Sequence, residues 1–237
     1  YKRQVFRLLV EALAGRRRDG TAPFTVMSCD NLRGNGDTIR RSLLGYAAAV
    51  DPALARWIED QVRFPNCMVD RIAPLVNDAR RAELNALAGI DDAAATIGED
   101  HLQWVIEDDF PSGRPRWEEV GVTMSAEVAQ YEAVKGRMLN ACHVLMSYPA
   151  VLLGHRFVHE AMADPLVYRM LRTFVDQDVI PLITPPAGVQ LPDYRDQILS
   201  RFANPAVRDQ LLRIAMDGAA KIPVFHTVTL RTQIEQG

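Results

Sequence analysis

The chain has 237 residues, 48% of them hydrophobic and 24% charged, which is typical of a soluble globular protein of one large or two small domains. Its 27 basic and 30 acidic side chains give a net charge of −3, so neither a nucleic-acid-binding surface nor a basic membrane-binding helix is indicated. No apolar run approaches the roughly 18 residues of a membrane span, no signal peptide is visible, and three scattered cysteines favour a reducing compartment, so a cytoplasmic protein is expected.

The first expected element is a helix over residues 3–18, with apolar residues at helical spacing and three arginines in its last turn. Gly20 and Pro23 end this helix, and the β-rich run FTVMSCDN (residues 24–31) follows. A helix, a turn and a buried strand with polar residues beyond it are the order of an open α/β sheet. Ligands of such sheets bind beyond the strand ends, which is where Asn31 stands.

The loop NLRGNGDT follows, and a helix is expected to start near its end, with Asp37 or Thr38 as the N-cap, and to run to about Val50. A second short helix is expected after Asp51, with Pro52 in its first turn.

Residues 64–124 mix three strand-like runs with proline-rich connections, the runs being CMVDRIAPLV, HLQWVIEDDF and EEVGVTM. From Ser125 onward the pattern is helical. Expected helices cover residues 127–147, 149–163, 165–177, 191–203 and 205–219. The sequence therefore predicts an α/β part over residues 1–125, followed by an all-α part over residues 126–237.

The segment YEAVKGRMLNACHVLMSY (residues 131–148) groups polar side chains on one helix face. At about 100° per residue, Glu132, Lys135, Asn140 and His143 share an arc of roughly 140°. A desolvated lysine can have its pKa lowered toward neutrality and exchange a proton, while Asn and His hold the oxygen concerned. The alternative is a partly exposed helix face with an ordinary surface lysine, and the pattern alone leaves both interpretations open.

Other patterns carry no recognisable chemistry. Gly34 and Gly36 begin a G-x-G, but Ile39 breaks the dinucleotide fingerprint, and GNG is interpreted as a turn. His155 and His159 are four apart, yet the zincin order is absent and no third ligand lies at a usual distance, so no metal is expected. No G-x-S-x-G motif for a serine nucleophile is present.

Six motifs, in order along nearly the whole chain, resemble the polyol-specific long-chain dehydrogenases: FTVMSCDNLRGNG, PNCMVDRIAP, WVIEDDFPSGRPRWEEVGV, YEAVKGRMLNACH, HRFVHEAMADP and MDGAAKIPVF. The K-x4-N-x2-H pattern is specific to that family, and the likeness is greatest to its mannitol-oxidising members. The resemblance implies a metal-independent enzyme. Residues 1–125 would be the later part of a Rossmann-like dinucleotide-binding domain, and residues 126–237 a truncated, multi-helical substrate domain.

Catalytic roles follow from the resemblance, motif by motif. Lys135 would be the general base in alcohol oxidation and the general acid in ketose reduction. Asn140 and Asn31 would hydrogen-bond the reacting oxygen, and Glu132 would gate the exit of the proton to solvent.

The resemblance also implies four substrate-binding residues. His143 would orient a neighbouring hydroxyl and Asp70 would accept hydroxyls, while Arg213 and Lys221 would donate to the far end of the polyol. The implied reaction is NAD- or NADP-dependent interconversion of a polyol and a ketose, with D-mannitol and D-fructose expected. A fructuronate reductase and a D-arabinitol 4-dehydrogenase are the alternatives. Arg213 and Lys221 could pair with a carboxylate, which would favour the fructuronate reductase.

The family's glycine-rich phosphate loop and acidic ribose-binding residue are expected upstream of Tyr1. We therefore expect this chain to be a piece of a longer protein and to be inactive by itself. The residue that selects NAD or NADP is expected outside the chain. We also expect a monomer. The alternative from another functional class is that the chain is a non-catalytic helical interaction module.

Overall fold

A computed structural model describes residues 2–236 and resolves two compact units. The first unit comprises the chain up to Val69 together with Gln103–Ala129, and the second comprises Asp70–Leu102 together with the chain from Gln130 onward. This division follows spatial contacts, so it assigns residues 70–102 to the helical unit. The boundary near residue 125 stays a prediction.

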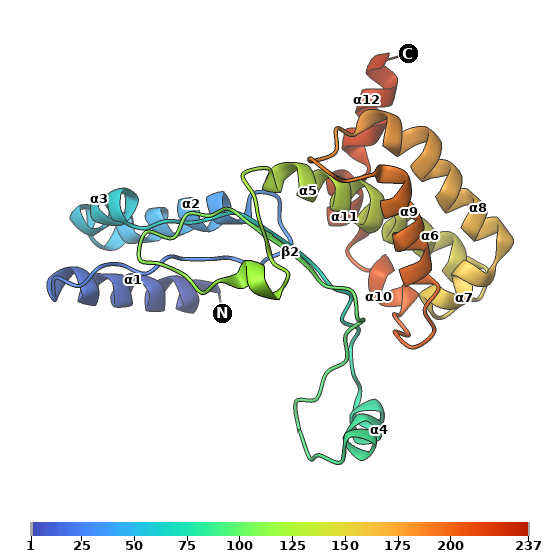
Figure 1. The fold of residues 1–237 in the computed structure, drawn as a ribbon, viewed down its shortest axis with the longest axis horizontal. Helices are drawn as coiled ribbons and strands as arrows, with labels where there is room; N and C mark the ends of the chain where they lie inside the picture. Colours follow the sequence, from blue (N-terminus) through green and yellow to red (C-terminus); the bar gives the residue numbers. More distant parts are fainter. Residues whose placement is uncertain (1, 237) are drawn as a thin grey trace. The chain divides into compact units, whose positions relative to one another are not determined.

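Three helices form the core of the first unit: α1 (Lys2–Arg18), α2 (Asn35–Val50) and α3 (Pro52–Gln61). Helix α2 packs against both of the others (Figure 1). Helix α3 is confirmed with its predicted start, because the Asp51 carboxylate accepts the backbone N–H groups of Ala53 and Leu54 at 2.8 and 3.2 Å.

The predicted N-cap of α2 was wrong. The helix begins after Gly34, which has a φ of 57°, and no side chain caps it; Asp37 and Thr38 lie within its first turn. Gly36 is buried against the backbone of Phe64 and Pro65, where a Cβ would clash. The glycines are needed for this turn and for close packing.

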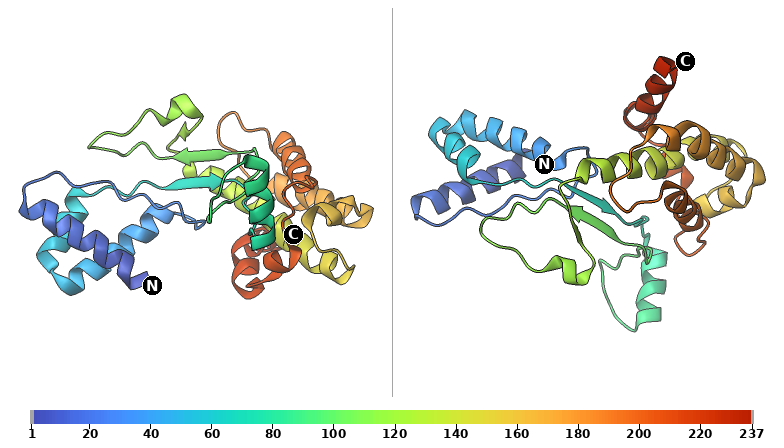
Figure 2. Two further views of the ribbon diagram at one scale, coloured as in Figure 1. Left: turned by 90° about the horizontal axis from the view of Figure 1, so that it is seen from below. Right: turned by 45° about the horizontal axis from the view of Figure 1, so that its top comes forward.

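The sheet has three strands in the order β1 (Cys67–Asp70), β2 (Gln103–Ile106) and β3 (Thr123–Met124), so each strand-like run contains one strand. Strands β2 and β3 are parallel, with Val105 opposite Thr123 (Figure 2). The short 3₁₀-helix η1 (Trp117–Val120) lies between them in sequence.

The run FTVMSCDN was expected to be a strand, and this was wrong for the described chain. Its residues form no sheet ladder, although the Val26 N–H donates to the Arg63 carbonyl at 3.0 Å. Composition favoured a strand here, but a strand also requires a neighbour to complete its ladder.

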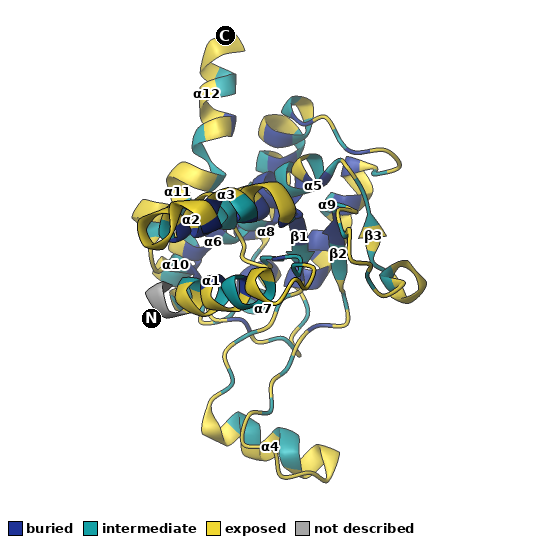
Figure 3. Cartoon of the chain, turned by 90° about the vertical axis from the view of Figure 1, so that its left-hand side faces the viewer, coloured by how far each residue is buried: buried dark blue, intermediate teal, exposed yellow. Residues whose placement is uncertain are grey.

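An unpredicted helix, α4 (Asp78–Ala88), lies within residues 70–102. The Asn77 side chain caps it by accepting the Arg80 N–H at 2.9 Å. None of its residues is buried, so the helix contributes no residue to a core (Figure 3).

The rest of the second unit is helical. Its elements are α5 (Val128–Val134), the π-helix η2 (Lys135–Asn140), α6 (Ala141–Leu152), α7 (Val158–Ala163), α8 (Pro165–Thr173), the π-helix η3 (Phe174–Val179), the 3₁₀-helix η4 (Ile180–Leu182), α9 (Leu191–Phe202), α10 (Leu211–Ala215), α11 (Gly218–Phe225) and α12 (Thr227–Gln236). Helix α6 packs against α7, α8, α10 and α11 and forms the centre of the core.

Two of the expected helices differ in extent from the helices of the structure. Pro149 lies inside α6 and does not end it, so the expected helix over residues 149–163 shrinks to α7. The expected helix over residues 205–219 is mostly loop, and it contains α10 and the first two residues of α11. Within the described residues, no helix has both the length and the apolarity to cross a lipid bilayer.

Candidate active site

Helices α5, η2 and α6 are one continuous helix whose middle turn is π-helical. The N–H of Ala141 donates to the carbonyl of Gly136, five residues earlier. This bonding pattern places residues five apart on the same face, one turn from each other. Lys135 and Asn140 are five apart, so the π turn aligns two side chains that α-helical geometry would separate by about 140°.

Lys135 is buried, with 7% of its surface exposed. Burial lowers the pKa of its amine below the ordinary lysine value; Arg201 lowers it further, while Asp70 and Glu132 oppose the shift. Of the two interpretations left open by the sequence, the exposed surface lysine is therefore wrong. Asn140 and Glu132 are half-buried on the same helix.

His143 follows one α-helical turn after Leu139, and its ring stacks on Phe202 with centroids 4.2 Å apart. Burial lowers the pKa of the imidazole to about 4, so the ring is neutral at physiological pH. Its Nε2 is buried without a hydrogen-bond partner among the residues that the structure describes.

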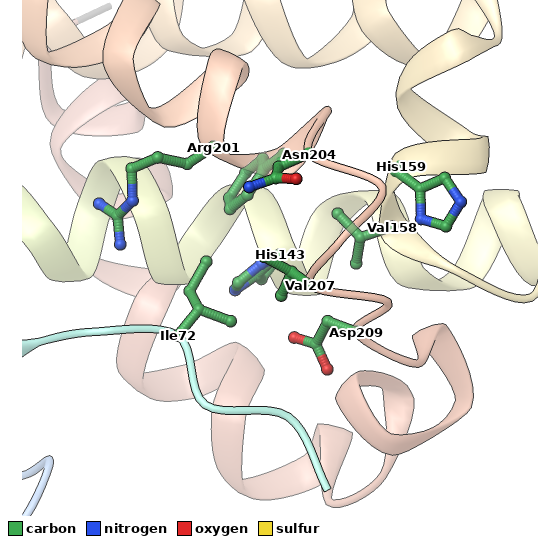
Figure 4. A pocket seen from close by; sticks show the side chains of 9 residues that line it. Ile72, His143, Val158, His159, Arg201, Asn204, Val207 and Asp209 are labelled. Atoms are coloured by element: carbon green, nitrogen blue, oxygen red, sulfur yellow. The ribbon is translucent and has the colours of Figure 1, made fainter. Parts of the chain in front are cut away.

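A small pocket of about 10 Å³ lies beside His143 and is lined on another side by Asp209 (Figure 4). One carboxylate oxygen of Asp209 is likewise buried and lacks a hydrogen-bond partner within the described chain. The space suits one water-sized group, such as a hydroxyl.

Asp70, at the end of β1, is bound by Arg201 of α9. The guanidinium donates to both carboxylate oxygens at 2.8 and 2.9 Å, and it also donates to Glu99 at 2.6 and 3.0 Å. Each oxygen of Asp70 retains a lone pair beyond these bonds. The expected contact between Asp70 and a substrate hydroxyl thus stays a prediction. The Asp70 carboxylate already has Arg201 as a partner.

The two cations expected at the far end of the substrate are also engaged. Arg213 donates to Asp209 at 2.6 Å, and Lys221 donates to the carbonyls of Ile214 and Met216 at 3.0 and 2.7 Å. These contacts hold both side chains close to α10. Their role toward a substrate stays a prediction.

Asn31 belongs to the first unit, where it is exposed in the loop before α2. Its backbone N–H donates to the Asp30 carboxylate at 2.9 Å. Its expected hydrogen bond to the reacting oxygen stays a prediction.

The histidine pair has contacts of a different kind from those of metal ligands. His155 lies before α7, and its Nε2 is 3.2 Å from Asp164, which caps α8. His159 stacks on Phe157. No group of three or more His, Cys, Asp or Glu side chains that could hold a metal ion is found in residues 2–236.

Sequence reasoning missed Arg201 and Glu99. Both are buried, at 8% and 4% exposed, and Arg201 forms ion pairs with both Asp70 and Glu99. Arg201 lies 131 residues from Asp70 and 102 from Glu99, so no local motif could join them.

The short parallel sheet with its helices, followed by an all-helical unit, places the chain among proteins that join a Rossmann-type domain to a helical domain. Residues 1–119 match the mannitol dehydrogenase Rossmann domain, and residues 127–237 match the mannitol dehydrogenase C-terminal domain. The chain belongs to the mannitol dehydrogenase family.

Several characterised relatives are similar along almost the whole chain. The polyol:NADP oxidoreductase of Gluconobacter oxydans (strain 621H) is 49% identical over 98% of this chain and 48% of its own length. The D-arabinitol 4-dehydrogenase of Ralstonia nicotianae is 43% identical over 97% of this chain and 49% of its own length.

Among solved structures, the ternary complex of Pseudomonas fluorescens mannitol 2-dehydrogenase with NAD and D-mannitol superimposes with a TM-score of 0.91. It is 45% identical over 98% of this chain and 47% of its own. The chain spans about half the length of the curated relatives it matches.

A Rossmann domain implies a dinucleotide, whose pyrophosphate requires glycine-rich backbone at a helix N-terminus. The start of α2 does not fit that role, because the space beside Gly36 is filled by the backbone of Phe64 and Pro65. No residue of the described chain is therefore assigned to the pyrophosphate.

Proposed function

We propose that the full-length protein is an NAD(P)-dependent polyol dehydrogenase in which Lys135 exchanges the proton of the reacting hydroxyl. The observation that carries this proposal is a buried lysine with a lowered pKa, aligned with Asn140 by a π-helical turn. A base of this kind takes a proton near neutral pH more readily than an ordinary lysine. Family membership supports the reaction class.

In this proposal the protein moves the proton and the dinucleotide accepts or supplies the hydride. Lys135 removes the hydroxyl proton in alcohol oxidation and returns it in ketose reduction. The amides of Asn140 and Asn31 donate to the oxygen, on which negative charge develops in the transition state. Glu132, one turn before the lysine, passes the proton toward solvent.

The remaining residues hold the substrate. His143 and Asp70 bind hydroxyls near the reacting carbon, and the pocket beside His143 is of a size for one such group. Arg213 and Lys221 bind the far end. Such contacts fix the carbon that reacts, which is the main contribution of a protein to hydride transfer.

D-Mannitol and D-fructose are the expected substrate pair. The uronate alternative is disfavoured because Arg213 is already paired with Asp209, which offsets the positive charge that a second carboxylate would need. The arabinitol alternative stays open, since a D-arabinitol 4-dehydrogenase is among the relatives.

The oligomeric state, the location in the cell and the independence from metal are also proposals. We propose a monomeric protein of the cytoplasm that binds its small-molecule substrate without a metal. The interaction-module alternative is disfavoured, because both halves of the chain match the domains of a dehydrogenase family. That alternative predicts that no G-x-G-x-x-G follows a first strand upstream of Tyr1.

The proposal is tested with Lys135→Ala and Lys135→Arg in the full-length protein. Both variants should lose turnover by at least about 10²-fold, because neither leaves a group that can exchange a proton near neutral pH. Lys135→Arg is the matched control: it keeps the positive charge of the lysine and removes only its ability to exchange a proton near neutral pH. Turnover of either variant within a few-fold of wild type would show that Lys135 is not the acid–base group.

A further inference from the structure

The Asp209 carboxylate is buried in the loop before α10, and only 3% of the residue is exposed. Backbone hydrogen bonds hold this loop against the start of α7. The Asp209 carbonyl accepts the N–H of Val158 at 3.0 Å, and the Leu211 N–H donates to the Arg156 carbonyl at 3.0 Å. The main chain on both sides of Asp209 therefore fixes the place of its carboxylate.

The two carboxylate oxygens of Asp209 have different surroundings. Oδ1 accepts three hydrogen bonds, from the Gln210 N–H at 2.9 Å and from the Arg213 guanidinium at 2.6 and 3.2 Å. Oδ2 is buried and has no hydrogen-bond partner among residues 2–236. A buried carboxylate oxygen without a donor is costly, so Oδ2 requires a donor that these residues do not supply.

Asp209 shares its pocket with a second unsatisfied polar atom. Asp209 and His143 both line the pocket of about 10 Å³ (Figure 4), and the Nε2 of His143 is likewise buried without a partner among the described residues. The imidazole is neutral, because burial lowers its pKa to about 4. A hydroxyl both donates and accepts, so one hydroxyl can satisfy the carboxylate oxygen and the imidazole nitrogen together.

The pocket wall favours an uncharged donor. Much of it is apolar, formed by Ile72, Val158, Phe202 and Val207. In such surroundings a hydrogen bond to a carboxylate is stronger than in water, because the local dielectric constant is low. An anionic group would meet the negative charge of Asp209, whereas a hydroxyl would not.

We propose that Asp209 is a further substrate-binding residue: its Oδ2 accepts one substrate hydroxyl, the same hydroxyl that interacts with the Nε2 of His143. The inference rests on the polyol dehydrogenase function proposed above, and it names a second protein group at that hydroxyl. Because Oδ1 binds Arg213, a single carboxylate then joins two residues that are proposed to hold the substrate.

Deoxy ketoses test the inference in the full-length protein. His143 is proposed to bind near the reacting carbon, which is C2 of D-fructose, so the hydroxyl concerned is the one on C1 or C3. We therefore compare kcat/KM for reduction of D-fructose, 1-deoxy-D-fructose and 3-deoxy-D-fructose. In wild type, one of the two analogues should lose at least about 10-fold, because it leaves a buried carboxylate without its donor.

Asp209→Asn should lower kcat/KM for D-fructose and make the same analogue lose clearly less relative to D-fructose, because the charged acceptor is absent. A weaker hold on Arg213 affects the ketoses alike and cancels in this ratio. Val207→Ala is the matched control, since it changes the same pocket without changing a polar atom. Its ratio should equal that of wild type.

Two results would overturn the inference. One is an equal ratio in wild type and Asp209→Asn. The other is a wild-type kcat/KM for both analogues within a few-fold of that for D-fructose, a comparison that decides even where Asp209→Asn fails to fold. Either result would mean that a buried water, and not the substrate, satisfies Oδ2.

Failure of the inference is distinguishable from failure of the proposed function. If Lys135→Ala keeps its turnover, the acid–base proposal fails, and the comparison of deoxy ketoses still reports on Asp209. If Lys135 is required but the ratio does not respond to Asp209→Asn, only the role of Asp209 is overturned.

Discussion

At the scale of single residues, burial determines the chemistry of the site. Lys135 and His143 lie on one helix, and burial lowers the pKa of each because water no longer stabilises the charged form. A neutral amine can accept a proton, and a neutral imidazole can both donate and accept a hydrogen bond. The same burial has a consequence for stability.

His143 should make the protein less stable in mild acid. Its pKa is about 4 in the folded protein, whereas an unperturbed histidine has a pKa of about 6.5. Between these values the unfolded chain binds a proton that the folded protein does not, so stability falls as the pH falls from about 6.5 toward 4. The full loss is of the order of 3 kcal/mol.

The check is the urea midpoint of wild type and His143→Gln between pH 7 and pH 4. The variant should lose less stability over this interval, because the amide does not titrate. Equal slopes for the two proteins would show that the imidazole protonates as easily in the folded state as in the unfolded chain.

At the scale of elements, local signals were readable from the sequence and non-local ones were not. Helices α1, α3 and α9 have regular apolar spacing, and α3 has an Asp51 cap; both are properties of neighbouring residues. Helix α4 does have a local signal, the Asn77 cap, but none of its residues is buried. The run at residues 24–31 has strand composition without a ladder, and neighbouring residues cannot reveal whether a partner strand is present.

The helix that carries Lys135 and Asn140 was predicted, but its π turn was not. An α-helical wheel already groups the polar residues, although with Asn140 at the edge of their arc. The bond from Ala141 to Gly136 corrects that placement. A π turn of this kind costs helix stability and often occurs at functional sites.

Insertion of one alanine after Gly136 places Lys135 and Asn140 six residues apart, so it should rotate Lys135 away from Asn140 by about 100°. We expect the full-length variant to keep its helical circular dichroism and to lose turnover by about 10²-fold or more. Retention of both helicity and turnover would mean that the alignment of these two side chains is not required.

At the scale of the whole molecule, the sequence predicted the family and the α/β-then-helical order. It did not predict that residues 70–102 pack with the helical unit. That packing depends on Arg201, which binds Asp70 and Glu99 near the two ends of the segment. A contact over more than 100 residues becomes visible only in the folded chain.

Substrate choice also belongs to this scale. We expect full-length protein to oxidise NADH or NADPH faster with D-fructose than with fructuronate, because Arg213 is already paired with a carboxylate. Xylulose is the third ketose to compare, because the arabinitol alternative is open. Initial rates with the three ketoses, measured in parallel with both cofactors, provide the check. A clear preference for fructuronate would favour the uronate reaction, and one for xylulose the arabinitol reaction.

The central claim is that the Lys135 amine loses its proton more readily than an ordinary lysine. ε-¹³C-lysine NMR of the full-length protein can follow this amine directly, with the signal that disappears in Lys135→Arg assigned to Lys135. We expect its titration midpoint to lie clearly below the ordinary value of about 10.4. A midpoint at or above that value would contradict the account.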